Sequence, residues 1–388
     1  MNESIRVLGV MTGTSCDGLD ASCVDFNGDG SRILWADSAP YPAALRKRVL
    51  QAQEPYTQAS LLDWHKLDRD LGDWYAKALE QLIQKHSEKP DAIANHGQTL
   101  GHHPKERITI QMGNPYEIAR KTRLTTVSGF REGDLAASGQ GAPLLPLYHR
   151  LLADILGHSS GIAIHNIGGI SNLTYVGPEG DILAFDTGPG NLWLDAATEK
   201  LTRGKQRFDR DGKLALKGEV DTGALQKLMR IPFLKKPAPK STGRDDFPFE
   251  ILLRASKKKG ESLIATALWF TVESIAQAYE KNILSKGKPL QTIVVCGGGA
   301  KNPSLMEALT IRLPNIEVIS SLDAGVDPSG IESQGFAYFG FRSLLGLSSS
   351  GVWTGAKGWV PPASIIPGEN WSTLTERIKI IRDQIKTQ

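Results

Sequence analysis

The sequence predicts an α/β protein of two domains that are built on one repeated pattern and flank a central cleft. Three observations support this prediction. The chain has 388 residues, which is longer than a domain with a single hydrophobic core usually is. It opens with three apolar strands joined by glycine-containing turns and followed by helices. The order strand, turn, strand, turn, strand then begins again near residue 161, which indicates a structural duplication.

The first half of the chain has the predicted order βββ-α-β-β-α-β, typical of a mixed sheet with helices on its faces. The turn Asn27-Gly28-Asp29-Gly30 is a strong hairpin signal. Apolar alternation and apolar runs predict strands at 5–11, 20–26, 32–38, 91–95, 108–112 and 124–130. Apolar residues at helical spacing predict helices at 61–86 and 116–123.

The second half repeats this style and then adds longer helices. Strands are predicted at 161–166, 172–176, 182–185 and 292–296, and helices at 263–284, 302–313 and 330–345. The stretch 203–254, rich in Lys, Pro, Gly and Asp, is expected to be irregular. We expect a first domain of residues 1–137 with about 330–388 returning to it as C-terminal helices, and a second domain of 138–329.

Composition excludes several classes of function. A net charge of +3 is too small for a nucleic-acid-binding footprint. No stretch of about 20 apolar residues predicts a membrane-spanning helix. The N-terminus lacks the pattern of a signal peptide, and the three cysteines show no disulfide framework. These features favour a cytoplasmic globular enzyme with a small-molecule substrate.

Three glycine-rich segments have the chemistry to bind a nucleotide. Amides and hydroxyls of the turn at 13–18 can surround phosphate oxygens, and Asp17 can hold Mg²⁺. The turn at 166–172 has the equivalent place in the second half. The glycines at 297–299 precede a helix, where a backbone can approach an adenosine ring. Each segment alone is also typical of an ordinary hairpin or βα loop, so the repetition is what favours phosphate binding.

Longer motifs resemble one family. In chain order they are GTSCDGLD, HGQT, FREGDLAASGQGAPLLP, NIGGISNLT, FDTGPGN, KSTGR, CGGGAKNP and a late helix containing IES. This series, from about residue 9 to 368, is similar to that of the anhydro-N-acetylmuramic acid kinases, in the actin-like ATPase and sugar kinase superfamily. The resemblance implies two RNase H-like domains flanking the cleft. Glu132-Gly133 and Ser333-Gln334 depart from the family's usual pattern.

The resemblance implies a coupled reaction. Water opens the 1,6-anhydro bridge of anhydro-N-acetylmuramic acid and ATP, with Mg²⁺, phosphorylates O6 to give N-acetylmuramic acid 6-phosphate during cell-wall recycling. A homodimer is also expected from the family. The expected nucleotide-binding residues are Gly13, Thr14, Ser15, Cys16, Asp17, Gly18, Leu19, Asp20, Gly168, Gly169, Asn172, Gly297, Gly298, Gly299 and Asn302. The expected sugar-binding residues are His96, Gln98, Thr99, Arg131, Asp134, Gln140, Gly188, Pro189 and Glu332.

Asp186 of FDTGPGN matches the family's catalytic aspartate and is expected to be the base that activates water. As a strand-end residue before a helix, it could instead cap that helix. Arg131 is expected to pair with the lactyl carboxylate or with phosphate, and alternatively with Asp134 on the surface. His96 could be an ordinary loop histidine and Glu332 an ordinary helix-surface residue. The role of KSTGR at 240–244 stays open between domain closure and substrate contact.

Other functions fit the motifs less well. A zinc site at His96, His102 and His103 is disfavoured, because adjacent histidines seldom converge on one ion and no carboxylate or cysteine has ligand spacing there. An ATP-gated binding protein such as an Hsp70-like chaperone would need a further peptide-binding domain. A polyphosphate phosphatase would explain the glycine turns but not HGQT or KSTGR.

Overall fold

The computed structural model describes residues 3–13, 16–27, 30–54, 57–157, 161–326 and 330–386. The chain divides into unit 1, Met1–Tyr148 with Ser329–Gln388, and unit 2, His149–Pro328. The division falls after Tyr148 rather than after residue 137, because the intervening residues bond to unit 1. The Gln140 amide donates to the Thr354 carbonyl (2.9 Å) and the Tyr148 hydroxyl donates to Gln334 (2.7 Å).

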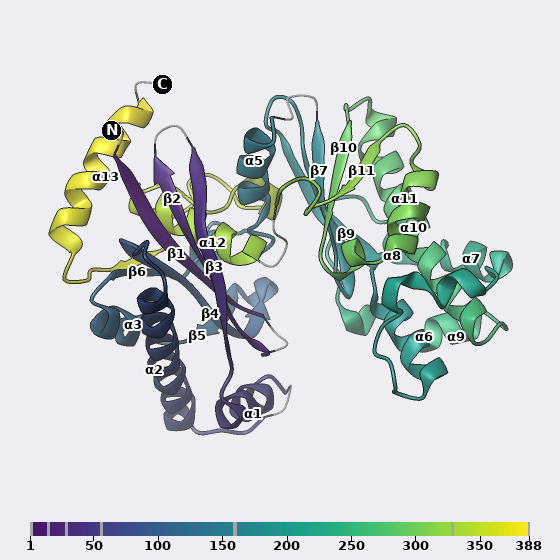
Figure 1. Ribbon diagram of the computed structural model, residues 1–388, viewed down its shortest axis with the longest axis horizontal. Helices are drawn as coiled ribbons and strands as arrows, with labels where there is room; N and C mark the ends of the chain where they lie inside the picture. Colours follow the sequence, from purple (N-terminus) through teal and green to yellow (C-terminus); the bar gives the residue numbers. More distant parts are fainter. Residues whose placement is uncertain are drawn as a thin grey trace. The chain divides into compact units, whose positions relative to one another are not determined.

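Unit 1 combines one sheet with helices from both ends of the chain (Figure 1). Its strands are β1 (Ser4–Thr12), β2 (Gly18–Asn27), β3 (Ser31–Pro40), β4 (Ala92–His103), β5 (Ile108–Met112), β6 (Thr125–Ser128) and β12 (Ser364–Ile366). Its helices are α1 (Ala43–Ala52), α2 (Leu61–Lys85), α3 (Pro115–Thr122), α4 (Glu132–Ala136), α12 (Ile331–Leu344) and α13 (Trp371–Lys386). Helix α5 (Pro146–Ile155) crosses from unit 1 to unit 2.

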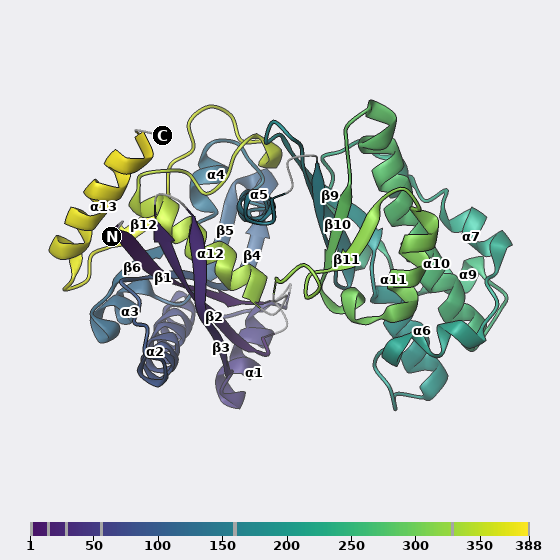
Figure 2. The same ribbon diagram turned by 45° about the horizontal axis from the view of Figure 1, so that its top comes forward.

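Unit 2 has a five-stranded sheet, and most of its helices lie between the third and fourth of these strands in sequence (Figure 2). Its strands are β7 (Ile162–Ile167), β8 (Ile170–Val176), β9 (Ile182–Pro189), β10 (Thr292–Cys296) and β11 (Glu317–Ser320). Its helices are α6 (Leu192–Thr202), α7 (Thr222–Leu228), α8 (Pro232–Lys235), α9 (Glu250–Ala255), α10 (Glu261–Asn282) and α11 (Pro303–Arg312).

The two sheets share one topology, which confirms the predicted duplication. In unit 1 the order β3-β2-β1-β4-β6 has antiparallel neighbours up to β1 and parallel neighbours from β1 to β6. In unit 2 the order β9-β8-β7-β10-β11 has the same senses. Unit 1 adds β5 beside β4 and β12 beside β6, both antiparallel.

Successive residues of β1 point to opposite faces of the sheet, and each face contacts a different helix. Leu8 and Val10 are fully buried in a cluster that includes Leu71 of α2. On the other face α12 approaches β1 so closely that a Cβ on Gly9 would lie 1.9 Å from the Ser333 carbonyl oxygen. Glycine at position 9 is therefore required by a backbone-to-backbone contact.

Unit 2 is organised by α10, a helix with buried residues on nearly all sides. Its side chains join a cluster that includes Phe185 of β9, Trp193 of α6 and Leu305 of α11. A helix that is apolar all round belongs in the interior, which matches its central place in the unit. The neighbouring strand β9 and helix α6 are held by this core.

The predicted elements are largely present, with three corrections. Strand β4 continues through HGQT to His103, where a strand was predicted only to residue 95, because Gln98 and Thr99 pair with β5. Strand β9 continues to Pro189 rather than ending at 185, because its last residues pair with β8. The stretch 203–254 is not wholly irregular, since it contains α7, α8 and α9.

Several side chains anchor the returning C-terminal segment in unit 1. Arg377 of α13 donates to both oxygens of Asp91 (2.6 and 3.0 Å) and to Glu3 (2.6 Å). The Asn370 side-chain amide donates to the Asp91 carbonyl (2.6 Å).

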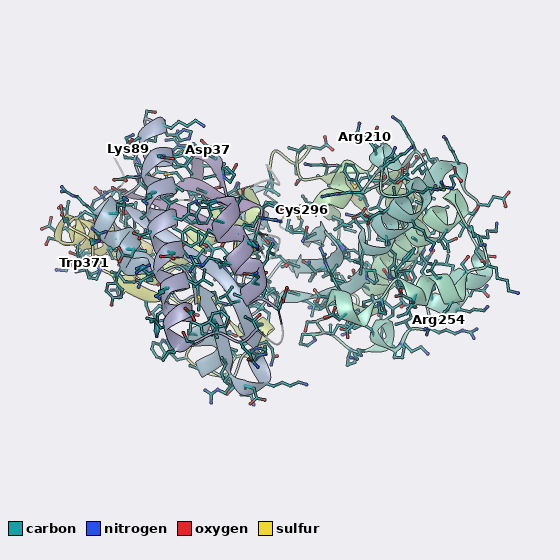
Figure 3. All side chains as sticks on the ribbon, turned by 90° about the horizontal axis from the view of Figure 1, so that it is seen from below. Asp37, Lys89, Arg210, Arg254, Cys296 and Trp371 are labelled. Atoms are coloured by element: carbon teal, nitrogen blue, oxygen red, sulfur yellow. The ribbon has the colours of Figure 1, made fainter. Side chains whose placement is uncertain are left out.

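Figure 3 shows the side chains of both units and labels Trp371, Asp37 and Lys89 of unit 1 and Arg210, Arg254 and Cys296 of unit 2. Within the described ranges, no helix has the length and apolar character that crossing a membrane requires.

Candidate active site

Asp186 lies within β9, opposite Asn172 of β8. Its side chain is half-buried, and burial raises the pKa of its carboxyl group to about 6. The Thr242 amide and the Lys240 charge work in the opposite direction and keep the pKa from rising further. A carboxyl group with this pKa is largely charged at neutral pH and can still accept a proton, as a general base must.

The alternative that Asp186 caps the following helix is wrong. Helix α6 starts at Leu192, and the residue at its cap position is Asn191. The Asn191 side chain donates to the Ile167 carbonyl (3.1 Å) and so ties the start of the helix to β7. Asp186 instead accepts a hydrogen bond at Oδ2 from the Thr242 amide (2.8 Å).

A buried chain of hydrogen bonds fixes the strand next to Asp186. The Thr187 and Ser171 hydroxyls are 2.8 Å apart, and Ser171 Oγ lies 2.6 Å from His165 Nε2. His165 Nδ1 lies 2.8 Å from the Tyr279 hydroxyl of α10. Burial lowers the pKa of His165 to about 3, so its ring is neutral. These contacts join β7, β8, β9 and α10 directly behind the predicted base.

The segment Lys240-Ser241-Thr242-Gly243-Arg244-Asp245-Asp246, here called the KSTGR segment, contacts Asp186 through its backbone as well. The Asp186 amide donates to the Lys240 carbonyl (2.9 Å). Lys240 Nζ donates to the Phe233 carbonyl (3.0 Å) and lies 4.5 Å from the Phe233 ring centre. Burial lowers the pKa of Lys240 to about 8. The sequence analysis left the role of this motif open, and in the structure its backbone contacts the predicted base.

Gly168 and Gly169 form the two-residue turn between β7 and β8. The Gly168 carbonyl accepts from the Asn191 amide (2.7 Å), and the Gly169 carbonyl accepts from the Gly190 amide (2.9 Å). The junction between β9 and α6 therefore holds this turn in place. Asn172, the third residue predicted here, is half-buried on β8.

A guanidinium group lies against this turn. A Cβ on Gly169 would be 3.4 Å from Nη2 of Arg244, so glycine leaves room for the arginine. Asp195 in the first turn of α6 has a pKa that burial raises to about 6 and that the Arg244 charge moderates. Arg244 was not among the predicted site residues, although an arginine is well suited to bind phosphate.

The third glycine segment is shaped by packing. Gly297 has φ 81°, and a Cβ there would lie 2.3 Å from Oδ1 of Asn166. A Cβ on Gly299 would lie 2.5 Å from the Ile167 side chain, whereas Gly298 is exposed. The Asn302 side chain accepts a hydrogen bond from the Leu305 amide (3.2 Å) and caps α11. Asn302 thus has a structural role that the sequence did not predict.

The first glycine turn is only partly described, because Thr14 and Ser15 lie outside the described residues. Gly13 and Gly18 on either side are half-buried. The side chains of Cys16 and Leu19 are fully buried in the unit 1 core, where they pack against α2 and its neighbours. The predicted nucleotide contact of these two residues would therefore be made by their backbone.

Two aspartates beside this turn are exposed. Asp17 Oδ1 lies 3.6 Å from Nη2 of Arg46, and Arg46 Nε donates to the Cys16 carbonyl (2.8 Å). Asp20 of β2 is solvent-accessible, yet the surrounding protein partly desolvates its carboxyl group and raises its pKa. Over the described part of the chain, no group of three or more His, Cys, Asp or Glu side chains could hold a metal ion.

His96 and Arg131 form a pair in unit 1. Arg131 Nε donates to His96 Nε2 (3.0 Å), so Nδ1 must carry the ring proton and donate to the Gly97 carbonyl (2.8 Å). Burial and the Arg131 charge lower the pKa of His96 well below its ordinary value. His96 is only 3% exposed, and both of its ring nitrogens are engaged in these two contacts.

Arg131 does not form the surface ion pair with Asp134 that the sequence left open; no such pair occurs between these two described residues. Arg131 Nη1 donates to the Gly141 carbonyl (2.6 Å). Asp134 is 1% exposed and accepts from the Gly141 amide (2.6 Å), Ser350 (2.5 Å) and Thr354 (2.5 Å). Its carboxylate therefore holds loops together and has no free face for a sugar, which corrects its predicted role.

The HGQT residues that follow His96 differ in exposure. Gln98 is fully buried and donates to the Gly13 carbonyl (3.2 Å), while Tyr41 donates to its side-chain oxygen (2.8 Å). Gln98 thus connects β4 to the first glycine turn. Thr99 is half-buried, and its hydroxyl accepts from Gln111 (3.3 Å). Contact between Gln98 and a sugar would require this network to open.

The remaining predicted sugar-binding residues divide by exposure. Gly188 and Pro189 are buried residues at the end of β9, where they pair with β8. Gln140 is exposed. Glu332 at the start of α12 is solvent-accessible, yet the surrounding protein desolvates its carboxylate and raises its pKa; Asp20 adds to the rise and Arg131 opposes it. Glu332 therefore lies in the electrostatic field of two other predicted site residues.

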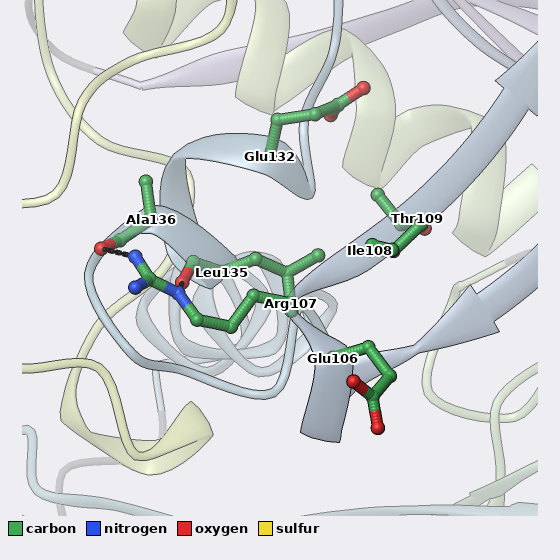
Figure 4. A pocket seen from close by; sticks show the side chains of 7 residues that line it. All are labelled: Glu106, Arg107, Ile108, Thr109, Glu132, Leu135 and Ala136. Carbon is green, nitrogen blue, oxygen red and sulfur yellow. Dashed lines mark hydrogen bonds between the residues drawn. The ribbon is translucent and has the colours of Figure 1, made fainter.

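A surface depression of about 550 Å³ lies in unit 1, lined by residues of α4 and of the segment that leads into β5. Figure 4 shows Arg107 among its lining residues, donating to the carbonyls of Leu135 (3.1 Å) and Ala136 (2.7 Å). Its lining residues are Glu106, Arg107, Ile108, Thr109, Glu132, Leu135 and Ala136. None of the predicted site residues lines this depression.

The duplicated α/β sheets, with Asp186 of pKa about 6 on β9 and Arg244 against the Gly168–Gly169 turn, fit an α/β kinase. Comparison with known proteins narrows the class. The sequence profile described as anhydro-N-acetylmuramic acid kinase matches residues 5–368. The chain belongs to the anhydro-N-acetylmuramic acid kinase family.

Named relatives agree along nearly the whole chain. The anhydro-N-acetylmuramic acid kinase of Pasteurella multocida is 37% identical over 372 residues, 93% of this chain and 97% of the relative. That of Caldanaerobacter subterraneus is 36% identical over 369 residues, 89% and 92% of the two chains. Among solved structures, the Clostridium difficile activator of 2-hydroxyisocaproyl-CoA dehydratase with bound ADPNP has 13% identity and a TM-score of 0.40, covering 88% of this chain and 95% of that chain.

Proposed function

We propose that this chain opens the 1,6-anhydro bridge of anhydro-N-acetylmuramic acid with water and transfers the γ-phosphoryl group of ATP to O6. The observation that carries the proposal is Asp186, a half-buried carboxylate with a pKa of about 6, in the FDTGPGN motif of the family. An ordinary aspartate would be a weaker base, whereas this one is matched to proton transfer near neutral pH.

The proposed chemistry balances around this carboxylate. Asp186 accepts a proton from a water molecule while the water oxygen bonds to C1 of the sugar. The C1–O6 bond breaks and its electron pair stays on O6, which then attacks the γ-phosphorus of ATP. ADP leaves, and the proton passes from Asp186 to solvent. A positioned general base contributes about 10²–10⁴-fold to such a step.

The phosphate groups need positive charge and donors close to them. Arg244 beside the Gly168–Gly169 turn is the described cation that fits this need in unit 2. Mg²⁺ commonly takes one or two protein carboxylates and fills its other positions with phosphate oxygens and water. The exposed Asp17 fits such a single-carboxylate site, and bound Mg²⁺ would neutralise phosphate charge there.

For the sugar, we propose that Arg131 pairs with the lactyl carboxylate. Its guanidinium group is held in place by hydrogen bonds to His96 and to the Gly141 carbonyl, and its other N–H groups remain available to bind a carboxylate. In this scheme His96, Gln98 and Asp134 position other groups, and Glu332 and Asp20 set the charge beside Arg131. The proposal also includes a homodimer, which rests on the family resemblance, and a cytoplasmic location, which rests on the composition.

The test is direct incubation with MgATP and anhydro-N-acetylmuramic acid in ¹⁸O-labelled water, followed by mass spectrometry. We expect equal amounts of ADP and N-acetylmuramic acid 6-phosphate, with the label at C1. Asp186→Asn should abolish sugar phosphorylation, while Asp181→Asn, an exposed aspartate just before β9, should react like the parent. Formation of ADP with no sugar phosphate, or of product without label, would overturn the proposal.

A further inference from the structure

One side of the KSTGR segment connects an exposed carboxylate to the predicted base. The Thr242 hydroxyl donates to Asp246 Oδ2 (2.6 Å), and the Gly243 amide donates to the same oxygen (3.3 Å). The Thr242 amide donates to Asp186 Oδ2 (2.8 Å). Asp246 thus holds Thr242, and Thr242 holds Asp186, over a separation of 56 residues in the chain.

The position of Thr242 depends on few other contacts. The segment is anchored before it by Lys240, which bonds the Phe233 carbonyl, and after it by the buried Phe247, whose carbonyl accepts from Trp193 (2.9 Å). Between these anchors, residues 243 to 246 are exposed and bury little apolar surface. Two backbone bonds within the stretch, from the Asp246 amide to the Gly243 carbonyl (3.3 Å) and from the Phe247 amide to the Arg244 carbonyl (3.1 Å), shape its turn. The two bonds to Asp246 Oδ2 are the side-chain contacts that direct the Thr242 amide, and they contribute little to the core.

We propose that Thr242 and Asp246 are positioning residues that hold the Asp186 carboxylate in its reactive orientation through the Thr242 N–H group. The proposal rests on the proposed function, in which Asp186 is the base. Asp246 touches neither substrate in this scheme; it acts only through Thr242. Asp186 is also bonded at its own amide by the Lys240 carbonyl, so the segment fixes both ends of the residue.

This arrangement has a consequence for protonation. The N–H bond from Thr242 favours the charged form of Asp186 and offsets part of the effect of burial on its pKa. Without that bond, the Asp186 carboxyl should bind its proton more tightly. The acid limb of the plot of kcat/KM against pH should then move to higher pH, since the base is active only when deprotonated. A purely structural role would lower stability and leave this limb in place.

The test compares Asp246→Ala and Thr242→Val with a matched control, Asp245→Ala, which removes a neighbouring exposed carboxylate. In both test variants we expect the midpoint of the acid limb to shift from near pH 6 to a pH about one unit higher. A shift of this size corresponds to the loss of one hydrogen bond to a charged group. Asp245→Ala should keep the parent limb. Thr242→Ser and Asp246→Asn retain a donor and an acceptor and should restore it.

A second readout does not depend on turnover. With ¹³C-labelled aspartate, the Asp186 carboxyl resonance, assigned by its loss in Asp186→Asn, can be titrated directly in the parent and in each variant. The Thr242→Val/Asp246→Ala double variant should shift the midpoint no more than either single variant. Unchanged midpoints and limbs would overturn the inference. If the parent titrates as expected but phosphorylates no sugar, the proposed function fails and the positioning contacts stand.

Discussion

Replacing Asp186 by Asn should stabilise the protein while it destroys activity. The carboxyl pKa of about 6 lies above the ordinary value of 3.8, so folding keeps a charge in a place that disfavours it. For a group whose pKa is raised on folding, stability is highest below the unfolded pKa and is lost as pH rises through the folded pKa. A difference of about two pH units corresponds to about 3 kcal/mol at pH 8.

An Asn side chain is uncharged at every pH, and its carbonyl oxygen can still accept from the Thr242 amide. Urea unfolding should therefore show Asp186→Asn to be more stable than the parent by about 3 kcal/mol at pH 8 and by roughly half as much at pH 5. A gain that is equal at both pH values, or a loss of stability at pH 8, would refute the reasoning, because only titration of Asp186 makes the difference depend on pH.

Three further predictions follow from single contacts. Arg244→Ala should raise the KM for MgATP by about tenfold or more, as expected for loss of a charged hydrogen bond to phosphate, and unchanged nucleotide binding in steady-state assays would exclude the contact. Asp134→Ala leaves three buried donors without their acceptor and should cost about 3–5 kcal/mol in urea unfolding, whereas the exposed Gln140→Ala should cost about 0.5 kcal/mol or less. Arg131→Met should raise the KM for the sugar by about tenfold but have little effect on an anhydro sugar without the lactyl carboxylate; an equal loss for both sugars would show that Arg131 does not read that group.

The strands and long helices were accessible from sequence because each leaves a local pattern. Alternation and apolar runs predicted β1 to β3 and the repeated group β7 to β9, and helical spacing predicted α2, α10 and α12. The ends of β4 and β9 were predicted too early. Their last residues, including Gln98 and Asp186, are polar or glycine-rich and stay extended only because neighbouring strands pair with them.

Partners of the site residues were harder to predict, since they come from distant parts of the chain. The motif FDTGPGN marked Asp186, but nothing local indicated that the Thr242 amide would bond it. Similarly, Asp134 was predicted to bind the sugar, and its buried partners Ser350 and Thr354 could not be predicted because they lie more than 200 positions away. Hydropathy periodicity reports which face of an element is buried, and it carries no information about which hydrogen-bond donors meet there.

The contact of α12 with β1 affects the order in which the chain can fold as it is made. Gly9 near the N-terminus meets the backbone of α12, and Asp91 meets Arg377 of α13. Because ribosomes release the N-terminal end first, the sheet of unit 1 must wait for about the last sixty positions before α12 covers one of its faces. Unit 2 is contiguous in sequence, so it can complete its core during synthesis while unit 1 still lacks α12 and α13.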